Sequence, residues 1–351
     1  MSTIHIPSLR RAILGWYDAR VRDLPWRGTR DPYRIWISEI MLQQTRAQAV
    51  KPYYEAFLRD WPTVKDLAAA DLQQVLKRWE GLGYYSRARN LHRSAIILTN
   101  EMGGTFPKTA LELRKLPGIG EYTAGMIASI AYDEASPAID GNQIRVLSRL
   151  FEMDEPAQSA PGKARIRAHA MQLIDAQRPG DFNQALMDIG AEICLPRNPR
   201  CADCPAKDQC LARAEGSPER LPVLPEKRDK RVERRGVAVV ICQRQVLVRQ
   251  RAEDGLLGGL WEFPHFLDAT TIVAMNACLD ELGIHAKSIG SLPGVEHVFT
   301  HLIWRMTGRA FRVTQMEDVQ GMRWVTAEEL TALPMPVAMA KYRDAALNLI
   351  E

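Results

Sequence analysis

The sequence predicts two domains of different class, an all-α domain followed by an α+β domain. The chain has 351 residues, more than one typical domain needs. Apolar residues recur at helical spacing through Arg213, and from Arg235 onward short β-branched runs read as strands. A Pro- and charge-rich stretch without apolar periodicity separates the two patterns. We therefore expect a helical domain at 1–216, a linker at 217–234 and an α+β domain at 235–351.

The composition is that of a globular protein, with 46% hydrophobic residues. No run approaches the ~18 consecutive apolar residues of a membrane-spanning helix, and the N-terminus lacks the apolar core of a signal peptide. We therefore expect a soluble, monomeric, cytoplasmic protein with no membrane partner. The net charge of +4 is too small to indicate nucleic acid by itself.

A first helix is expected at residues 8–20, and a second begins at Asp31 and Pro32, which are typical cap and first-turn residues. Glu39 lies in this second helix among apolar neighbours, which would raise its pKa by desolvation. Pairing with an arginine, either Arg22 or Arg27, would lower that pKa instead. The two alternatives predict opposite shifts, and the sequence leaves both open.

A glycine-rich turn, LPGIG at residues 116–120, interrupts the helical pattern, because Pro lacks a donor and Gly favours other backbone angles. The backbone N–H groups of Gly118, Ile119 and Gly120 would point outward beside the next helix and could hold a phosphate. An ordinary helical hairpin turn with a glycine cap is the alternative.

Asp140 stands where a helix N-cap is expected, before a segment of apolar periodicity. A helix N-terminus favours the ionised carboxylate, so we expect Asp140 to be charged at neutral pH. Capping alone is the plain alternative. With Glu39 it forms a pair of carboxyl groups in different environments, as expected when one donates a proton and the other stays charged.

Four of the six cysteines follow with the spacing C-x6-C-x2-C-x5-C, at Cys194, Cys201, Cys204 and Cys210. Disulfides are disfavoured in a reducing compartment, so this spacing indicates a metal site. Four close thiolates suit tetrahedral zinc or a [4Fe–4S] cluster. Physical argument leaves both open, and general frequency favours zinc.

Together these motifs resemble the helix-hairpin-helix DNA glycosylases, and in particular the MutY-type adenine glycosylases. The likeness rests on WISEIMLQQT at 36–45, LPGIGEYTAG at 116–125, AIDGNQIRVLSR at 138–149 and the cysteine spacing. It implies base-excision repair of double-stranded DNA, with adenine flipped and removed opposite oxoguanine or guanine. It also implies a [4Fe–4S] cluster in loop 194–210 and a bacterial-type, nucleoid-associated protein.

The resemblance assigns roles to individual residues. Glu39 would protonate adenine at N7, and Asp140 would stabilise the sugar cation that forms as the bond breaks. Tyr122 and Asn142 match positions that contact the reacting nucleotide or place the nucleophile. The positions matching the family's adenine pocket are Arg22, Trp26, Arg27 and Leu42.

Two further stretches match the family's DNA contacts. Gln44, which would enter the base stack, and Thr45, near the lesion base, continue the second helix at its polar end. Leu82 and Tyr84 match the wedge on the opposite side, in a loop with two glycines that suits close approach to DNA.

Basic residues from Arg87 onward follow this loop and suit a phosphate backbone. A solvated helix face is the alternative for these basic residues, and a buried side chain is the alternative for Tyr85.

One departure bears on the mechanism. Lyase members of the superfamily carry a lysine where this chain has Tyr122, and some MutY proteins carry one where it has Ile144. A Schiff-base nucleophile needs an amine. We therefore expect a monofunctional glycosylase.

The C-terminal domain resembles the Nudix fold. We expect strands at 236–242 and 245–251, then a glycine-rich loop and another strand within 255–266, a helix at 270–283 and a strand at 293–313. That helix reads NACLDELG, so Asp280 and Glu281 would make a poor Mg²⁺ site, and hydrolase activity is not expected.

The family's lesion-recognition loop is Phe-Ser-His, matched here by Phe299, Thr300 and His301. Thr keeps the hydroxyl and adds a methyl group. A polar pair of His297 and His301 at a strand end is the alternative.

Three other functions compete with this interpretation. An endonuclease III-like lyase is disfavoured by the missing lysine, and a nucleotide pyrophosphohydrolase by the altered Nudix helix. A non-catalytic DNA-binding or redox-sensing cluster protein is disfavoured by the intact Glu39 and Asp140.

Overall fold

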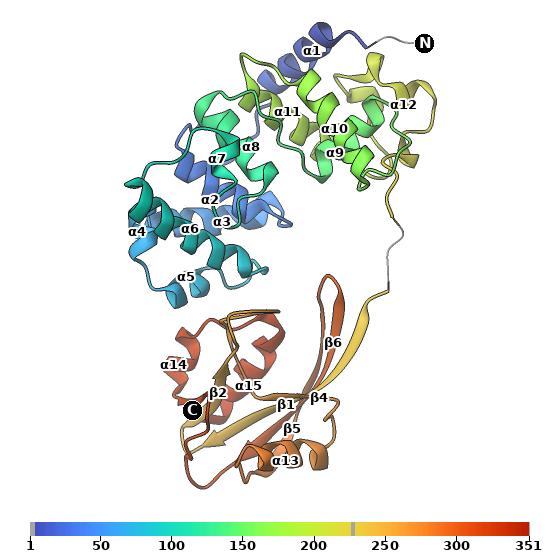
Figure 1. Ribbon diagram of the computed structural model, residues 1–351. Helices are drawn as coiled ribbons and strands as arrows, with labels where there is room; N and C mark the ends of the chain where they lie inside the picture. Colours follow the sequence, from blue (N-terminus) through green and yellow to red (C-terminus); the bar gives the residue numbers. More distant parts are fainter. Residues whose placement is uncertain (1–3, 226–228, 351) are drawn as a thin grey trace. The chain divides into compact units, whose positions relative to one another are not determined.

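The computed structural model describes residues 4–225 and 229–350 (Figure 1). These form two compact units. The first comprises residues 4–69 and 90–225, and the second comprises residues 70–89 and 229–350. Residues 70–89 thus group with the C-terminal residues, whereas the sequence placed them in the helical domain. The predicted domain limits stay a prediction, and residues 226–228 of the predicted linker lie outside the described residues.

The described chain before residue 226 is helical, as predicted. Its α-helices are α1 Ile6–Asp18, α2 Pro32–Leu42, α3 Ala47–Asp60, α4 Val64–Ala69, α5 Leu72–Arg78, α6 Ser86–Met102, α7 Ala110–Leu113, α8 Glu121–Tyr132, α9 Gly141–Leu150, α10 Ala160–Leu173, α11 Pro179–Glu192 and α12 Leu211–Ala214. Several begin at a side chain that accepts a backbone N–H of the first turn, among them Asp31, Asp71, Asp140 and Ser159. No described helix is long and apolar enough to cross a membrane.

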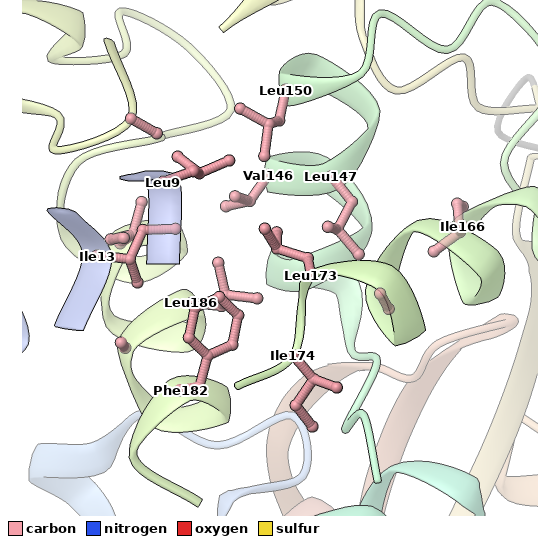
Figure 2. Close-up of a cluster of buried hydrophobic side chains, with 14 of the residues drawn as sticks. Leu9, Ile13, Val146, Leu147, Leu150, Ile166, Leu173, Ile174, Phe182 and Leu186 are labelled. Atoms are coloured by element: carbon pink, nitrogen blue, oxygen red, sulfur yellow. The ribbon is translucent and has the colours of Figure 1, made fainter. Parts of the chain in front are cut away.

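One apolar core joins helices α1, α9, α10 and α11 (Figure 2). Leu9 and Ile13 of α1 meet Val146 and Leu150 of α9, and Phe182 of α11 packs into the same cluster. Three of the four predicted metal-binding cysteines pack against its edge. The core therefore fixes the helix that Asp140 caps and the cysteine loop on the same scaffold.

Helix α8 is buried around most of its circumference, from Thr123 to Ser129. The chain then returns alongside it, and Gly125 makes this close approach possible. A Cβ atom at Gly125 would lie 2.6 Å from the carbonyl oxygen of Pro137. Because the returning segment lies against α8, Asp140 comes back toward the residues that begin α8.

Helix α2 ends at Leu42, and the predicted continuation through Gln43, Gln44 and Thr45 is wrong. Gln43 has ψ of 113°, and Gln44 has φ of 58° in the left-handed region. Both dihedral angles are incompatible with an α-helix. Gln44 therefore lies in a turn beyond the helix.

The C-terminal residues form a seven-stranded mixed sheet, with strands β1 Arg231–Cys242, β2 Gln245–Gln250, β3 Trp261–Glu262, β4 His265–Leu267, β5 Lys287–Val298, β6 Leu302–Arg312 and β7 Met322–Val325. The main order is β3-β2-β1-β6-β5, with β4 paired to β1 and β7 to β2. Only the β1–β6 pair is parallel among the described strand pairs. The predicted strand 293–313 is in fact two antiparallel strands, β5 and β6, joined by residues 299–301.

Side chains of β1 alternate between two apolar cores, one on each face of the sheet. Helix α13, Ile272–Glu281, contributes Met275 and Leu279 to one core. Helices α14, Ala327–Ala332, and α15, Ala340–Ile350, cover the other face. The sequence did not predict β7, α14 or α15.

Candidate active site

Glu39 lies in the middle of α2 and is 4% exposed. The hydroxyl of Tyr122, in the first turn of α8, donates a 2.6 Å hydrogen bond to its Oε2 atom. Burial raises the pKa of Glu39 to about 7, against the lowering effects of this bond and of the Arg27 charge. The desolvation alternative is therefore confirmed.

The two arginines considered as partners of Glu39 pair with Asp188 of α11 instead. Arg27 Nη2 lies 2.9 Å and Arg22 Nη1 lies 3.4 Å from Asp188 Oδ1, and the Asp188 side chain is 3% exposed. Arg27 also donates to the side-chain carbonyl of Gln184. The arginine charge is thus held by another carboxylate, which leaves Glu39 without a direct ion pair among the described residues.

Asp140 caps α9 as predicted. Its Oδ1 atom accepts the backbone N–H of Gln143 at 2.7 Å, and its Oδ2 atom accepts the Asn142 side-chain amide at 3.0 Å. Burial raises its pKa, while the hydrogen bonds from Gln143 and Asn142 lower it. The Asp140 charge also raises the pKa of Glu39, so the two carboxyl groups interact electrostatically.

Asn142 is itself held in place by Arg145. Arg145 Nη2 lies 2.9 Å from Asn142 Oδ1 and 2.7 Å from the carbonyl oxygen of Gly190. Arg145 Nε donates to the carbonyl oxygen of Cys194 at 2.7 Å. A hydrogen-bonded path therefore runs from Asp140 through Asn142 to the start of the cysteine loop.

Two predicted pocket residues remain, Trp26 and Leu42. Trp26 is buried and packs edge-on against Tyr54, with 5.4 Å between the ring centroids. Leu42 is half-buried at the end of α2. Helix α11 adds residues that the sequence reasoning missed, namely Gln184, Met187 and Asp188. Met187 Sδ lies 3.3 Å from the Tyr122 hydroxyl. The polar residues Gln184 and Asp188 within the largely apolar segment FNQALMDIGAEIC could have indicated this role from the sequence.

The predicted phosphate cradle precedes α8. Gly118 has φ of 76°, and a Cβ atom there would lie 2.7 Å from Asn90 Cβ, so this turn needs glycine. Gly120 caps α8 without a side chain. Ile119 is buried and its N–H donates to the Leu116 carbonyl, so the turn itself uses one of the three predicted donors.

The predicted wedge loop belongs to the second unit. Tyr84 is 46% exposed with φ of 48°, whereas Leu82 is buried. Arg87 is also buried, and its Nη2 atom donates to the carbonyl oxygens of Leu82 and Gly83, each at 3.1 Å. Arg87 therefore braces this loop, and its contact with DNA stays a prediction. Tyr85 is buried, as its alternative predicted.

Phe299, Thr300 and His301 form the turn between β5 and β6. The Phe299 ring packs edge-on against the rings of His297 and Trp304, with ring centroids 4.5 Å and 4.9 Å apart. These contacts fix the base of the turn. Thr300 and His301 are exposed. The Thr300 hydroxyl lies 2.9 Å from the Tyr84 hydroxyl, so the second unit brings together a predicted wedge residue and a predicted lesion-recognition residue.

The four predicted cysteine ligands line one pocket together with Arg149. Burial raises the pKa values of Cys201 and Cys210, and raises that of Cys204 to about 12. Among the described residues, no three His, Cys, Asp or Glu side chains are placed to hold a single metal ion.

The acidic residues of α13 form no such cluster either. Asp280 Oδ1 lies 2.9 Å from the ring nitrogen Nδ1 of His285. The buried Glu262 of β3 is bound by Arg249, Arg251 and His265. The absence of hydrolase activity stays a prediction.

Comparison with known proteins gives two family matches. Residues 37–175 match the HhH-GPD superfamily of base excision DNA repair proteins, and residues 236–345 match the NUDIX domain. The human adenine DNA glycosylase is 35% identical over 400 aligned residues, which cover 96% of this chain and 73% of the human protein.

Two solved structures share the fold of the helical part. A thermostable thymine-DNA glycosylase is 30% identical with a TM-score of 0.55, covering 60% of this chain and 96% of that protein. Endonuclease III in a trapped covalent DNA complex is 20% identical with a TM-score of 0.51, covering 61% of this chain and 99% of that protein. The predicted fold class, a helix-hairpin-helix glycosylase domain followed by an α+β Nudix-like domain, is confirmed.

Proposed function

The chain belongs to the adenine DNA glycosylases of base excision repair, and we propose that its substrate is adenine mispaired with oxoguanine or guanine in double-stranded DNA. The enzyme hydrolyses the N-glycosyl bond of the adenine nucleotide. Because that bond is hidden inside a base stack, the adenine would be flipped out of the duplex to reach Glu39 and Asp140.

Two carboxyl groups divide the chemistry. Glu39, protonated at neutral pH to a substantial degree, gives its proton to adenine N7 and makes the base a better leaving group. Asp140 stays ionised and stabilises the positive charge that develops on the sugar. Asn142 holds the Asp140 carboxylate, and Tyr122 holds that of Glu39.

The observation that carries this proposal is the environment of Glu39. A carboxyl group with a pKa of about 7 is available both as an acid and, after proton transfer, as a base near physiological pH. The ion pairs of Arg22 and Arg27 with Asp188 support this proposal, because either arginine, if paired with Glu39, would keep the Glu39 carboxyl group ionised.

We propose that the product is an abasic site, without strand cleavage by the enzyme. The hydroxyl of Tyr122 occupies the position where lyase members of the superfamily carry an amine, and it is engaged by Glu39. A phenol cannot form the Schiff base that strand cleavage by a lyase requires.

The DNA contacts extend over both units. The hairpin at 118–120 would hold a phosphate, Gln44 and Tyr84 would fill the stack, and Thr45 would lie near the base opposite adenine. Gln44 and Tyr84 are both exposed, which supports this assignment, because a residue that enters the base stack must reach the DNA. The exposed hydroxyl of Thr300 would read the oxidised guanine. We expect the protein to act as a cytoplasmic, nucleoid-associated monomer.

We further propose a [4Fe–4S] cluster bound by Cys194, Cys201, Cys204 and Cys210. The residues fit this group, since four thiols line one pocket. Burial keeps three of the thiols protonated unless a metal stabilises their thiolates. When bound, the cluster would fix the conformation of loop 194–210.

The test is single-turnover cleavage of duplexes with adenine opposite oxoguanine, analysed before and after alkali. We expect strand breaks only after alkali, and none with Asp140→Asn or with an A·T duplex. Breaks without alkali would show lyase activity and overturn the monofunctional assignment. No breaks from folded, metal-loaded protein would overturn the substrate assignment.

A further inference from the structure

Arg149, in the last turn of α9, is 2% exposed, and its side chain donates to backbone carbonyl oxygens and to one cysteine sulfur. Its Nε atom donates to the carbonyl oxygen of Leu221 at 3.0 Å, and Nη2 donates to that of Pro196 at 3.0 Å. Its Nη1 atom donates to the carbonyl oxygen of Leu195 at 2.7 Å and lies 3.3 Å from Cys194 Sγ. Within residues 4–225 and 229–350, no carboxylate forms an ion pair with it.

This burial needs a counter-charge. A guanidinium is always protonated in proteins, and moving it out of water is strongly unfavourable unless an anion accompanies it. Carbonyl oxygens satisfy its hydrogen bonds but do not neutralise its charge. By contrast, Arg27 of the candidate active site, whose side chain is 10% exposed, has Asp188 as its partner.

The anion that fits is the thiolate shell of the cysteine pocket. Arg149 lines this pocket, and its backbone carbonyl accepts a contact from Cys210 Sγ at 3.5 Å. Four thiolates around a metal group carry the negative charge that the buried guanidinium lacks.

We propose that Arg149 is the internal counter-cation of the cysteine-bound cluster and the clasp that closes its loop. The inference rests on the proposed [4Fe–4S] cluster. Arg149 joins the residues that follow the first ligand, Leu195 and Pro196, to Leu221, which lies beyond the fourth ligand. One side chain therefore ties both ends of the loop and donates a hydrogen bond to a ligand sulfur.

Two measurable consequences follow. A positive charge and an N–H···S bond at the ligand sulfur favour the more reduced, more negative state of a cluster, so Arg149 raises its reduction potential. Removing the clasp loosens the loop, so the cluster should be lost faster. Arg149 does not touch the predicted reacting atoms, and it acts as a positioning residue.

The experiment compares wild type with Arg149→Lys and Arg149→Gln, measuring iron and sulfide per chain, reduction potential by voltammetry and the rate of cluster loss in air. Arg213→Gln is the matched control, because Arg213 lines the same pocket but is exposed and donates to the Lys207 carbonyl. We expect Arg149→Gln to have a lower reduction potential and to lose the cluster faster than wild type. Arg149→Lys should change both quantities less, because lysine keeps the charge but lacks the planar set of donors of the guanidinium. Arg213→Gln should have wild-type values.

The outcomes separate the two proposals. Wild-type protein that binds no iron and sulfide would overturn the cluster, and the role of Arg149 with it. A loaded wild type whose potential and rate of loss are matched by Arg149→Gln would overturn the role of Arg149 alone. If Arg149→Gln does not fold, Arg149→Lys is the deciding variant. An unchanged reduction potential and an unchanged rate of cluster loss in Arg149→Lys would show that the hydrogen-bond geometry of Arg149 contributes nothing.

Discussion

The hydroxyl of Tyr122 lies 2.6 Å from Glu39 Oε2 and joins the first turn of α8 to the middle of α2. The bond has an electrostatic consequence, because a donor to the ionised carboxylate lowers the pKa that burial has raised. Tyr122 therefore tunes the pKa of the candidate acid.

The rate of adenine release should follow the protonation of Glu39. We expect the single-turnover rate constant to be nearly constant below pH 7 and to fall about tenfold per unit well above it, because only the protonated carboxyl group donates. In Tyr122→Phe the lowering hydrogen bond is lost, the pKa of Glu39 rises, and the fall should move to higher pH. A shift to lower pH, or a pH-independent rate, would contradict this assignment.

Asp188→Asn should shift the fall of the single-turnover rate to lower pH, opposite to the shift expected for Tyr122→Phe. Without its counter-anion, Arg27 favours the ionised form of Glu39 more strongly, so the pKa falls and the rate should decline at lower pH. Breaking the buried pair should also cost about 3 kcal/mol of unfolding free energy, measured with denaturant. Glu192→Gln, at the exposed partner of Arg22, is the control and should change neither quantity measurably.

Local signals in the sequence predicted much of this site. Asp31 and Asp140 were predicted as helix caps because each precedes a segment with helical apolar periodicity. The short side chain of aspartate can accept a backbone N–H of the first turn. The burial of Glu39 followed from its neighbours along one helix. The pairing of Arg22 and Arg27 with Asp188 could not be predicted, because it joins residues more than 160 positions apart and depends on how α11 packs.

The errors in secondary structure also have physical causes. Glutamine is a good helix former, so nothing in Gln43 and Gln44 indicated the end of α2. The tip residues Phe299, Thr300 and His301 include neither Gly nor Pro, so β5 and β6 read as one strand. In both places the residue expected to contact DNA lies in the irregular segment, which is where functional constraints override local preference.

Gly190→Ala tests the packing that holds Asn142. A Cβ atom at Gly190 would lie 2.6 Å from Asn142 Cβ, so α9 and α11 must separate. We expect a loss of about 1–3 kcal/mol in stability and a rate lower by about 10- to 100-fold, because displaced catalytic groups lose their alignment.

Gly15→Ala in α1 is the control for Gly190→Ala, since nothing lies within 4 Å of its added Cβ. It should gain up to about 1 kcal/mol from helix propensity at an unchanged rate. Equal rates for the two variants would show that the α9–α11 contact does not position Asn142.

Asp140 has two roles that substitutions can separate. Asn caps helices as well as Asp does, so Asp140→Asn should keep the bond to the Gln143 N–H and the stability of α9 while removing the charge. Asp140→Ala removes both and should cost about 1 kcal/mol more. If the charge stabilises the sugar cation, both variants lose at least about 100-fold in single-turnover rate. Ser159→Ala, which removes the cap of α10, should lower stability alone. A wild-type rate in Asp140→Asn would mean that Asp140 only caps its helix.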